Sequence, residues 1–267
     1  MLRFLSFGSG SSGNCYLLYT ESDALMIDAG VGVRSLKKYA CDFGINMSLL
    51  HNLIITHDHA DHIKCVGSLS HDMHLPVWAT EEVHKGIDRN YCVSRKVEMI
   101  NRHVMQPGVT VNLGEFTVTP FSVPHDSSDN VGYNIEVNGN TFCIITDAGK
   151  VTDEMAEYIS RANYLVIEAN HDKEMLMGGP YPTYLKERIS SDTGHLCNTD
   201  CAEALVNNIT ERLKHVWLCH LSEENNHPEL ARKTIEAVMR SHGIIPGVDF
   251  QLDILKRTVP TGIFNLE

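Results

Sequence analysis

The densest chemical feature of this chain is the segment THDHADH at residues 56–62, which holds four potential metal ligands. It follows the apolar run 53–55 and is therefore expected at the carboxyl end of a strand, where ligand sites of α/β sheets gather. Imidazole suits zinc, iron, nickel or copper, and carboxylates suit hard divalent ions, so the segment predicts a metal centre. The candidate ligands are His57, His59, Asp61 and His62.

Three further candidate ligands each follow an apolar, strand-like run. They are His125 in SVPHD, Asp147 in IITDAG and His220 in VWLCH. Taken singly, each could be an ordinary loop residue. Together with the segment 56–62 they are numerous enough to complete the coordination spheres of two metal ions.

This pattern resembles the metallo-β-lactamase superfamily over nearly the whole chain, because 57–62 matches its HxHxDH motif and the three later residues match its later ligands in order and approximate spacing. The resemblance implies an α/β fold, a four-layer αββα sandwich. It implies one metal ion held by His57, His59 and His125, and a second held by Asp61, His62 and His220, with Asp147 bridging the two. It also implies that Asp28, in MIDAG, braces the histidine loop through hydrogen bonds without binding metal.

Hydrolysis is the chemistry that two such ions support. Ions about 3.5–4 Å apart share a bridging hydroxide that acts as nucleophile at neutral pH. We expect zinc, with manganese, iron or nickel as other candidates, and we count Asp61 as catalytic as well as a ligand. Two carboxylates offset only half of the formal charge of the two ions, so the site should attract anions.

Several residues differ from those of other branches of the superfamily, and these differences reduce the number of possible substrate classes. His59 stands where oxygen-reducing di-iron members carry Glu, and Asp147 stands where secreted lactamases commonly carry Cys. The segments GSGSSGN at 8–14, EANHD at 168–172 and GHLCN at 194–198 are instead similar to the YycJ (WalJ) type of bacterial metallo-hydrolase. Around His195 the chain also resembles ribonuclease Z and the phosphodiesterase of phosphonate utilisation. These resemblances imply cleavage of phosphodiester bonds, as a DNA exonuclease working in the 5′-to-3′ direction.

His195 is the candidate general acid, because in the phosphodiesterases that it resembles a histidine outside the ligand set protonates the departing oxygen. The alternative is that it lies in a loop where Asn198 caps a helix starting at Thr199. His171 could contact the substrate phosphate or brace His195. Ser12 belongs to a loop that could offer backbone N–H groups to phosphate or form a tight turn. The substrate-binding candidates are therefore Ser12, His171 and Asn198.

Composition sets limits on partners and location. The net charge is −12, from 34 acidic and 22 basic residues, which argues against non-specific coating of nucleic acid but permits an enzyme that grips phosphate at a metal centre. No run of 18 apolar residues indicates a membrane span, and neither an export signal nor a CxxC pair is evident. We therefore expect a cytoplasmic protein with reduced cysteines, no membrane partner, and either nucleic acid or a small phosphodiester as substrate. The alternatives are a thioester or lactone hydrolase of the glyoxalase II sort and a metal-binding interaction module.

Alternating strands and helices must position these residues, and no linker divides them, so residues 1–267 are expected to form a single domain. Asn138-Gly139-Asn140 is a strong hairpin signal between two strands. Strands are predicted at 2–7, 14–19, 24–28, 53–56, 76–79, 109–113, 115–121, 131–137, 141–146, 164–168, 215–219 and 249–255. Helices are predicted at 34–43, 60–70, 81–88, 152–162, 182–190 and 199–209, and from Pro228 onward.

Overall fold

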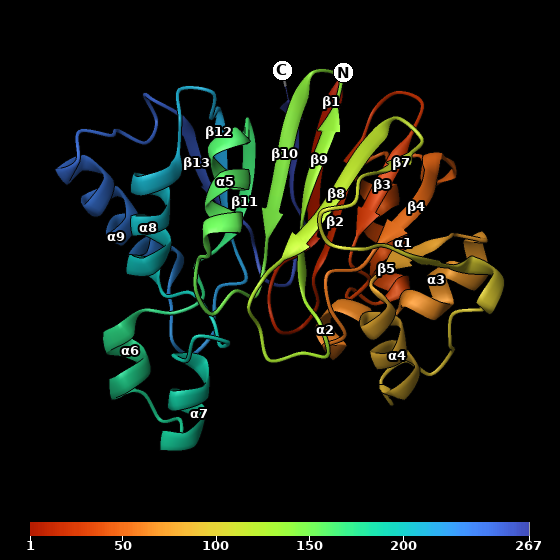
Figure 1. Ribbon diagram of the computed structural model, residues 1–267, viewed down its shortest axis with the longest axis horizontal. Helices are drawn as coiled ribbons and strands as arrows, with labels where there is room; N and C mark the ends of the chain where they lie inside the picture. The colour runs from red at the N-terminus through yellow and green to blue at the C-terminus, as the bar shows by residue number, and fades with distance from the viewer. Residues whose placement is uncertain (267) are drawn as a thin grey trace.

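Two seven-stranded sheets pack face to face, with helices on their outer faces, as Figure 1 shows. The structure is a computed structural model and describes residues 1–266. One sheet has the strand order β14-β1-β2-β3-β4-β5-β6 and the other has the order β13-β12-β11-β10-β9-β8-β7. The order of layers, helix, sheet, sheet and helix, confirms the predicted αββα sandwich.

The first sheet is built from the N-terminal part of the chain and one strand from its end. Its strands are β1 (Leu2–Gly8), β2 (Cys15–Tyr19), β3 (Ala24–Ile27), β4 (Leu50–Ile54), β5 (Val77–Ala79), β6 (Arg102–Val104) and β14 (Thr261–Leu266). Its helices are α1 (Val33–Asp42), α2 (Ala60–Ile63), α3 (Val66–Met73) and α4 (Glu81–Arg89), with short 3₁₀ turns at Met47–Leu49 and Met99–Asn101. From β3 to β6 the strands run parallel, so their carboxyl ends meet at one edge.

The second sheet holds the rest of the chain. Its strands are β7 (Val111–Leu113), β8 (Phe116–Ser122), β9 (Val131–Val137), β10 (Asn140–Ile145), β11 (Tyr164–Glu168), β12 (His215–Cys219) and β13 (Gln251–Ile254). Its helices are α5 (Asp153–Arg161), α6 (Lys173–Gly178), α7 (Thr183–Ile189), α8 (Asn198–Asn208) and α9 (Pro228–Ser241). From β10 to β13 the strands run parallel. The carboxyl ends of β10, β11 and β12 therefore also share one edge.

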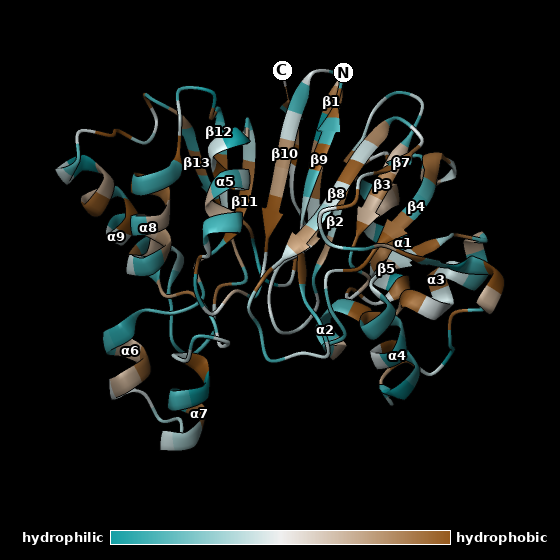
Figure 2. Ribbon diagram, in the orientation of Figure 1, coloured by the Kyte–Doolittle hydropathy of each residue, from teal (hydrophilic) through white to brown (hydrophobic). Residues whose placement is uncertain are grey.

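Aromatic side chains fill the space between the sheets. Trp217 on β12 is fully buried, and its ring centroid lies 4.8 Å from that of Phe4 and 6.1 Å from that of Phe142. Such ring pairs contribute about 0.5–1.5 kcal/mol beyond the apolar area that they bury. Figure 2 shows the hydrophobic residues concentrated along the strands, with hydrophilic residues on the outward helix faces. The packed sheets therefore form a rigid frame for the loops at their carboxyl edge.

Most predicted elements are confirmed, including the hairpin between β9 and β10. Asn138 and Gly139 both adopt positive φ there, at 52° and 76°, as this tight turn requires. The predicted helix over 60–70 is wrong as a single element, because the chain breaks near Cys65 between α2 and α3. Besides the two 3₁₀ turns, two strands and one α-helix escaped prediction: the short strand β6, the half-exposed strand β14, and α6, which is only six residues long. Each is too short or too exposed to carry a clear hydrophobic period.

Among residues 1–266, all eight cysteines are free thiols. Among residues 1–266, no helix combines the length and apolar character needed to cross a membrane.

Candidate metal centre

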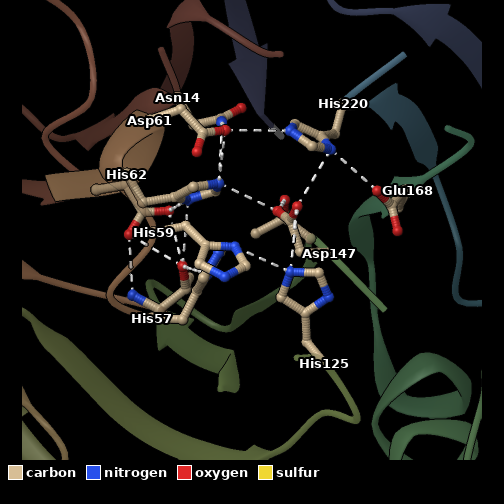
Figure 3. A network of polar contacts seen from close by, with 12 residues as sticks. Asn14, His57, His59, Asp61, His62, His125, Asp147, Glu168 and His220 are labelled. Carbon is tan, nitrogen blue, oxygen red and sulfur yellow. Dashed lines mark hydrogen bonds and ion pairs between the residues drawn. The ribbon is translucent and has the colours of Figure 1, made fainter. Parts of the chain in front are cut away.

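All seven predicted ligands converge at the carboxyl edge of the two sheets, where Figure 3 shows them facing one another. Each comes from the loop or short helix that follows a strand: β4 for the segment 56–62, β8 for His125, β10 for Asp147 and β12 for His220. Four groups of three or more donor atoms each lie within 4.8 Å of one another, and two of these groups correspond to the predicted ligand sets. They are His57, His59 and His125, called here the three-histidine half, and Asp61, His62 and His220, which with Asp147 are called the carboxylate-rich half.

The three-histidine half has the properties of a ligand set. His57 Nε2 is buried without any hydrogen-bond partner among the described residues, an orphaned state that a metal ion would relieve. Burial lowers the pKa of His57 well below its usual value and also lowers that of His125, so both rings are neutral, as ligation requires. His125 Nδ1 lies 2.9 Å from the Gly194 carbonyl, which orients its other nitrogen toward His59, 3.2 Å away. These donors fit a divalent cation.

The carboxylate-rich half is more deeply buried and strongly charged. Asp147 Oδ2 lies 3.1 Å from His62 Nε2, and Asp147 Oδ1 lies 3.2 Å from His220 Nδ1. Burial would raise the pKa of Asp147, but the two histidines outweigh it and hold the pKa well below its usual value. Burial works against protonation of His62, yet the surrounding carboxylates raise the pKa of its ring to about 10. Two ionised carboxylates with two imidazoles form a donor set of the kind that binds divalent metals.

Asp28 stands directly behind this half. Its carboxylate lies 2.7 Å from His62 Nδ1 and accepts a hydrogen bond of 2.8 Å from the Thr56 backbone N–H. The residue is fully buried and has a φ of 61°, a conformation that Asp tolerates better than most residues. This is the geometry that a brace of the histidine loop requires.

His195 lies beside the centre, outside the seven predicted ligands. Its ring centroid is 5.0 Å from that of His125 and 5.4 Å from that of His220. His195 Nδ1 is 2.8 Å from Glu168 Oε1, and its side chain keeps 16% of its surface exposed. Burial opposes protonation of this ring, but the Glu168 carboxylate outweighs burial and raises the pKa of His195 above its usual value.

Glu168 is a site residue that the sequence analysis missed. It ends the buried strand β11, and burial would raise its pKa, but His195 in particular holds the pKa of its carboxyl at about 2. One oxygen contacts His195 and also lies 3.0 Å from His220 Nδ1, while the other accepts hydrogen bonds from the backbone N–H groups of Ala148 and Leu196. The signal available was an acid at the end of the apolar run YLVIE, where an unpartnered carboxylate is rare.

Asn14 was also missed. Its backbone N–H donates to the Asp61 carbonyl at 2.7 Å, and its side-chain Nδ2 donates to Asp61 Oδ2 at 3.1 Å. The same Nδ2 lies 2.9 Å from His62 Nε2. The turn before β2 therefore helps to hold the carboxylate-rich half in place, a contact between segments that are far apart in the sequence.

The three substrate-binding candidates lie in different settings. Ser12 is exposed in the tight turn between β1 and β2. His171 is buried, and it makes no hydrogen bond to His195 among residues 1–266; its backbone carbonyl accepts from the Asn198 N–H at 2.8 Å. Glu168, and not His171, therefore braces His195.

The predictions for Asn198 need correction. Helix α8 begins at Asn198, and the residue that caps it is Cys197, whose Sγ accepts from the Asp200 N–H. The Asn198 side chain is 1% exposed and exchanges hydrogen bonds of 3.0 and 2.9 Å with that of Asn226. Asn198 thus joins the start of α8 to the loop before α9 inside the protein, and it has almost no exposed surface to offer a substrate.

Comparisons with known proteins point to one family. The model of the beta-lactamase superfamily domain matches residues 24–220. The chain is 34% identical over 262 residues to the exodeoxyribonuclease YycJ of Bacillus anthracis, covering 98% of both chains. It is also 34% identical over 250 residues to the exodeoxyribonuclease WalJ of Streptococcus pneumoniae (strain ATCC BAA-255 / R6), covering 94% of this chain and 93% of the relative.

Solved structures are similar in fold at much lower identity. The metallo-beta-lactamase fold protein YhfI of Bacillus subtilis superposes with a TM-score of 0.70 at 17% identity, covering 98% of this chain and 99% of its own. Zinc-bound PqqB of Methylobacterium extorquens gives a TM-score of 0.69 at 14% identity, covering 98% and 100%. A diphosphatase of the PhnP family gives 0.67 at 16% identity, covering 99% and 98%.

Proposed function

This chain belongs to the metallo-β-lactamase superfamily and is a hydrolase of that superfamily, and on this premise we propose that it is a DNA exonuclease that uses two divalent metal ions. The observation that carries the proposal is the Glu168–His195 pair beside the ligand set. A hydrolase acting on thioesters has little need of such an acid, because a thiolate leaves readily. An alkoxide released from a phosphodiester is a poor leaving group and needs a proton.

The ligand residues would hold the two cations, zinc or manganese being our candidates. When bound, the ions supply Lewis-acid stabilisation of charge on the phosphate and a hydroxide nucleophile at neutral pH. Asp147 faces donors of both halves, with its second oxygen 3.9 Å from His125 Nε2, and is assigned the bridging role. Asp61 is 21% exposed and is assigned a catalytic role in orienting the attacking water.

His195 is assigned the role of general acid. Its Nδ1 is engaged by Glu168, so Nε2 is the atom from which the proton would pass to the departing oxygen. The Glu168 carboxylate favours the imidazolium form and fixes the ring orientation, and the backbone N–H groups of Ala148 and Leu196 hold its other oxygen in place. This pair is the part of the site that distinguishes phosphodiester cleavage from reactions with a stable leaving group.

Nucleic acid as substrate is supported by the curated relatives and by exposed aromatic residues. Tyr184 on α7 and Tyr91, just after α4, are 72% and 93% exposed. In Figure 1, α7 and α4 project on opposite sides of the edge that carries the ligand loops. Exposed aromatic rings are the platforms on which unpaired bases stack.

The scattered basic residues limit how much duplex the protein can grip. Arg188 on α7 pairs with Asp126, and Lys37 on α1 lies 3.8 Å from Asp72, so neither is left to contact a phosphate backbone alone. Because the net charge of the protein is −12, we expect it to bind DNA weakly away from the metal centre and to contact only a short stretch of the strand.

Digestion of DNA and RNA labelled at either end tests this function. With Zn²⁺ or Mn²⁺ supplied, we expect mononucleotide release from DNA, starting at the 5′ end. No cleavage of any strand with either metal would contradict the nuclease proposal, and hydrolysis of thioesters or lactones instead would favour the glyoxalase II-like alternative.

The His195→Ala variant tests the general acid. We expect a loss of about 10²–10⁴-fold in kcat on an alkyl phosphodiester and a much smaller loss on a nitrophenyl phosphodiester, because nitrophenolate leaves without a proton. His171→Ala serves as the matched control, since His171 is a nearby buried histidine that forms no hydrogen bond to Glu168 or His195 among the described residues. Equal losses of His195→Ala on both substrates would rule out the leaving-group role.

A further inference from the structure

A small hollow of about 260 Å³ opens beside the turn between β1 and β2. Its lining includes Gly8, Ser12 and Gly13 of the turn, Ser35 and Tyr39 of α1, and Arg257. Lys64, just after α2, supplies a second cation. No carboxylate lines it, which is unusual in a chain with a net charge of −12, so the hollow is a locally positive place.

Neither cation of the hollow is neutralised. Lys64 Nζ donates to the carbonyl of Ser12, and an Arg257 guanidinium N–H donates to the carbonyl of Ser222 at 3.3 Å. Within residues 1–266, neither side chain forms an ion pair with an acidic residue, whereas Arg188 and Arg102 each do. Each cation is therefore positioned by a backbone oxygen and keeps further donors for a ligand.

The hollow is tied to the carboxylate-rich half of the metal centre. Lys64 follows the ligand His62 by two residues, and Arg257 bonds to Ser222, which follows the ligand His220 by two residues. From the turn itself, Asn14 contacts the carboxylate of Asp61, as Figure 3 shows. The hollow and the carboxylate-rich half therefore share the turn at residues 8–14, which lines the hollow and whose Asn14 reaches Asp61.

The charge of the hollow selects one kind of phosphate. A terminal phosphate monoester carries about −1.5 to −2 at pH 7, whereas a phosphodiester within a strand carries only one negative charge. Two unpaired cations with no acid match the monoester better. We propose that this hollow binds the terminal phosphate of the DNA strand that is cleaved at the metal centre, an inference that rests on the proposed nuclease function.

Strands of one sequence that end in a 5′-phosphate, a 5′-hydroxyl, a 3′-phosphate or a 3′-hydroxyl test this proposal. We expect kcat/KM to be at least about tenfold higher for one phosphorylated end than for the matching hydroxyl end, and the 5′ and 3′ arms identify which end it is. Lys64→Gln and Arg257→Gln should each bring that ratio close to one. Both kcat/KM values are measured on one enzyme preparation, so a partial loss of folded enzyme lowers both equally and leaves their ratio unchanged.

Lys233→Gln is the matched control, since Lys233 is an exposed cation on α9 and should leave the ratio as it is in the unaltered protein. A ratio near one in the unaltered protein, or a ratio that both hollow variants retain, would overturn the proposal. Binding of the same strands to His195→Ala, measured by fluorescence anisotropy, separates the two hypotheses. A phosphate-dependent affinity that Lys64→Gln abolishes, without cleavage by the unaltered enzyme, would support the hollow and contradict the nuclease function.

Discussion

The two halves of the metal centre would each hold a divalent cation, but with different donor groups. In the three-histidine half, the pKa values of His57 and His125 are lowered and His59 is partly exposed. Its outer contacts are a hydroxyl, a backbone carbonyl and the carboxylate of Asp126, which is paired with Arg188. The carboxylate-rich half is more buried, contains two carboxylates, and is backed by two further carboxylates, Asp28 and Glu168. One half contains only imidazole donors, and the other combines imidazoles with carboxylates.

The carboxylates that would help to bind a metal ion also stabilise protons on the neighbouring histidines. Protons and metal ions therefore compete for the carboxylate-rich half. Burial opposes charge on His62 and His220, but nearby carboxylates raise the pKa of each ring well above its usual value. A cation entering the carboxylate-rich half must expel such protons, whereas His57 has none to lose at neutral pH. The two halves should therefore fill with different pH dependence and respond differently to the loss of their partners.

Asp147→Asn should have the largest effect, because Asp147 is the residue that faces both halves. We expect activity to fall by well over about 100-fold, since even residues that only orient a ligand are worth about 10–100-fold. Metal content by mass spectrometry should show both ions weakened. Asp126→Asn is the control: Asp126 lies near His59 but is paired with Arg188, and full metal content is expected there. A variant that lost one ion only would contradict the bridging role.

Asp28→Asn should affect one half only. Asparagine tolerates the positive φ of this position, but it lacks the charge that holds His62, so we expect about 10–100-fold weaker binding of the second ion. Titration of metal-free protein with Zn²⁺ against a chromophoric chelator measures both affinities. The first ion, in the three-histidine half, should bind nearly as before. Equal weakening of both ions would break the distinction between the halves.

The pH dependence of metal binding should also separate the halves. The pKa of His62 is raised to about 10 and that of His220 is raised well above its usual value, so both rings are protonated at pH 7 and each must lose a proton to bind metal. Affinity for the second ion should therefore rise by up to about 100-fold per pH unit above pH 7, about tenfold for each proton released, while that of the first ion changes little. The number of protons released for each ion bound can be measured from the pH change when Zn²⁺ is added in weakly buffered solution. Release accompanying the first ion rather than the second would reverse the assignment.

Thr56→Val should have the smallest effect. Thr56 Oγ1 lies 3.0 Å from His57 Nδ1 and donates to Asp28, so its loss removes one neutral contact from the three-histidine half. We expect affinity for the first ion to fall by less than about tenfold, at the low end of what such partners contribute. The chelator titration used for Asp28→Asn measures this as well. A loss as large as that caused by Asp28→Asn would show that charge is not what separates the two halves.

Local patterns account for the parts of the molecule that the sequence predicted well. The segment 56–62 reveals its ligands because their spacing is local, and the hairpin at 138–139 is visible because positive φ favours Asn and Gly. His125 and His220 were harder, since each is an ordinary histidine until the motif supplies its partners. Edge strand β14 and helix α6 were missed because short, half-exposed elements depend on pairing or capping by distant residues.

By itself, the sequence determined the sandwich, the ligand residues to consider, and the candidate acid His195, since each depends on residue type and order along the chain. Only the tertiary structure decided that Glu168 braces His195 and that Asn14 reaches Asp61. It further decided that the Asn198 side chain is hydrogen-bonded to Asn226. It also decided that Lys64 and Arg257 share one hollow. The physical reason is that hydrogen bonds and charge pairs act over a few ångströms, and only the packing of the two sheets brings their opposite loops that close.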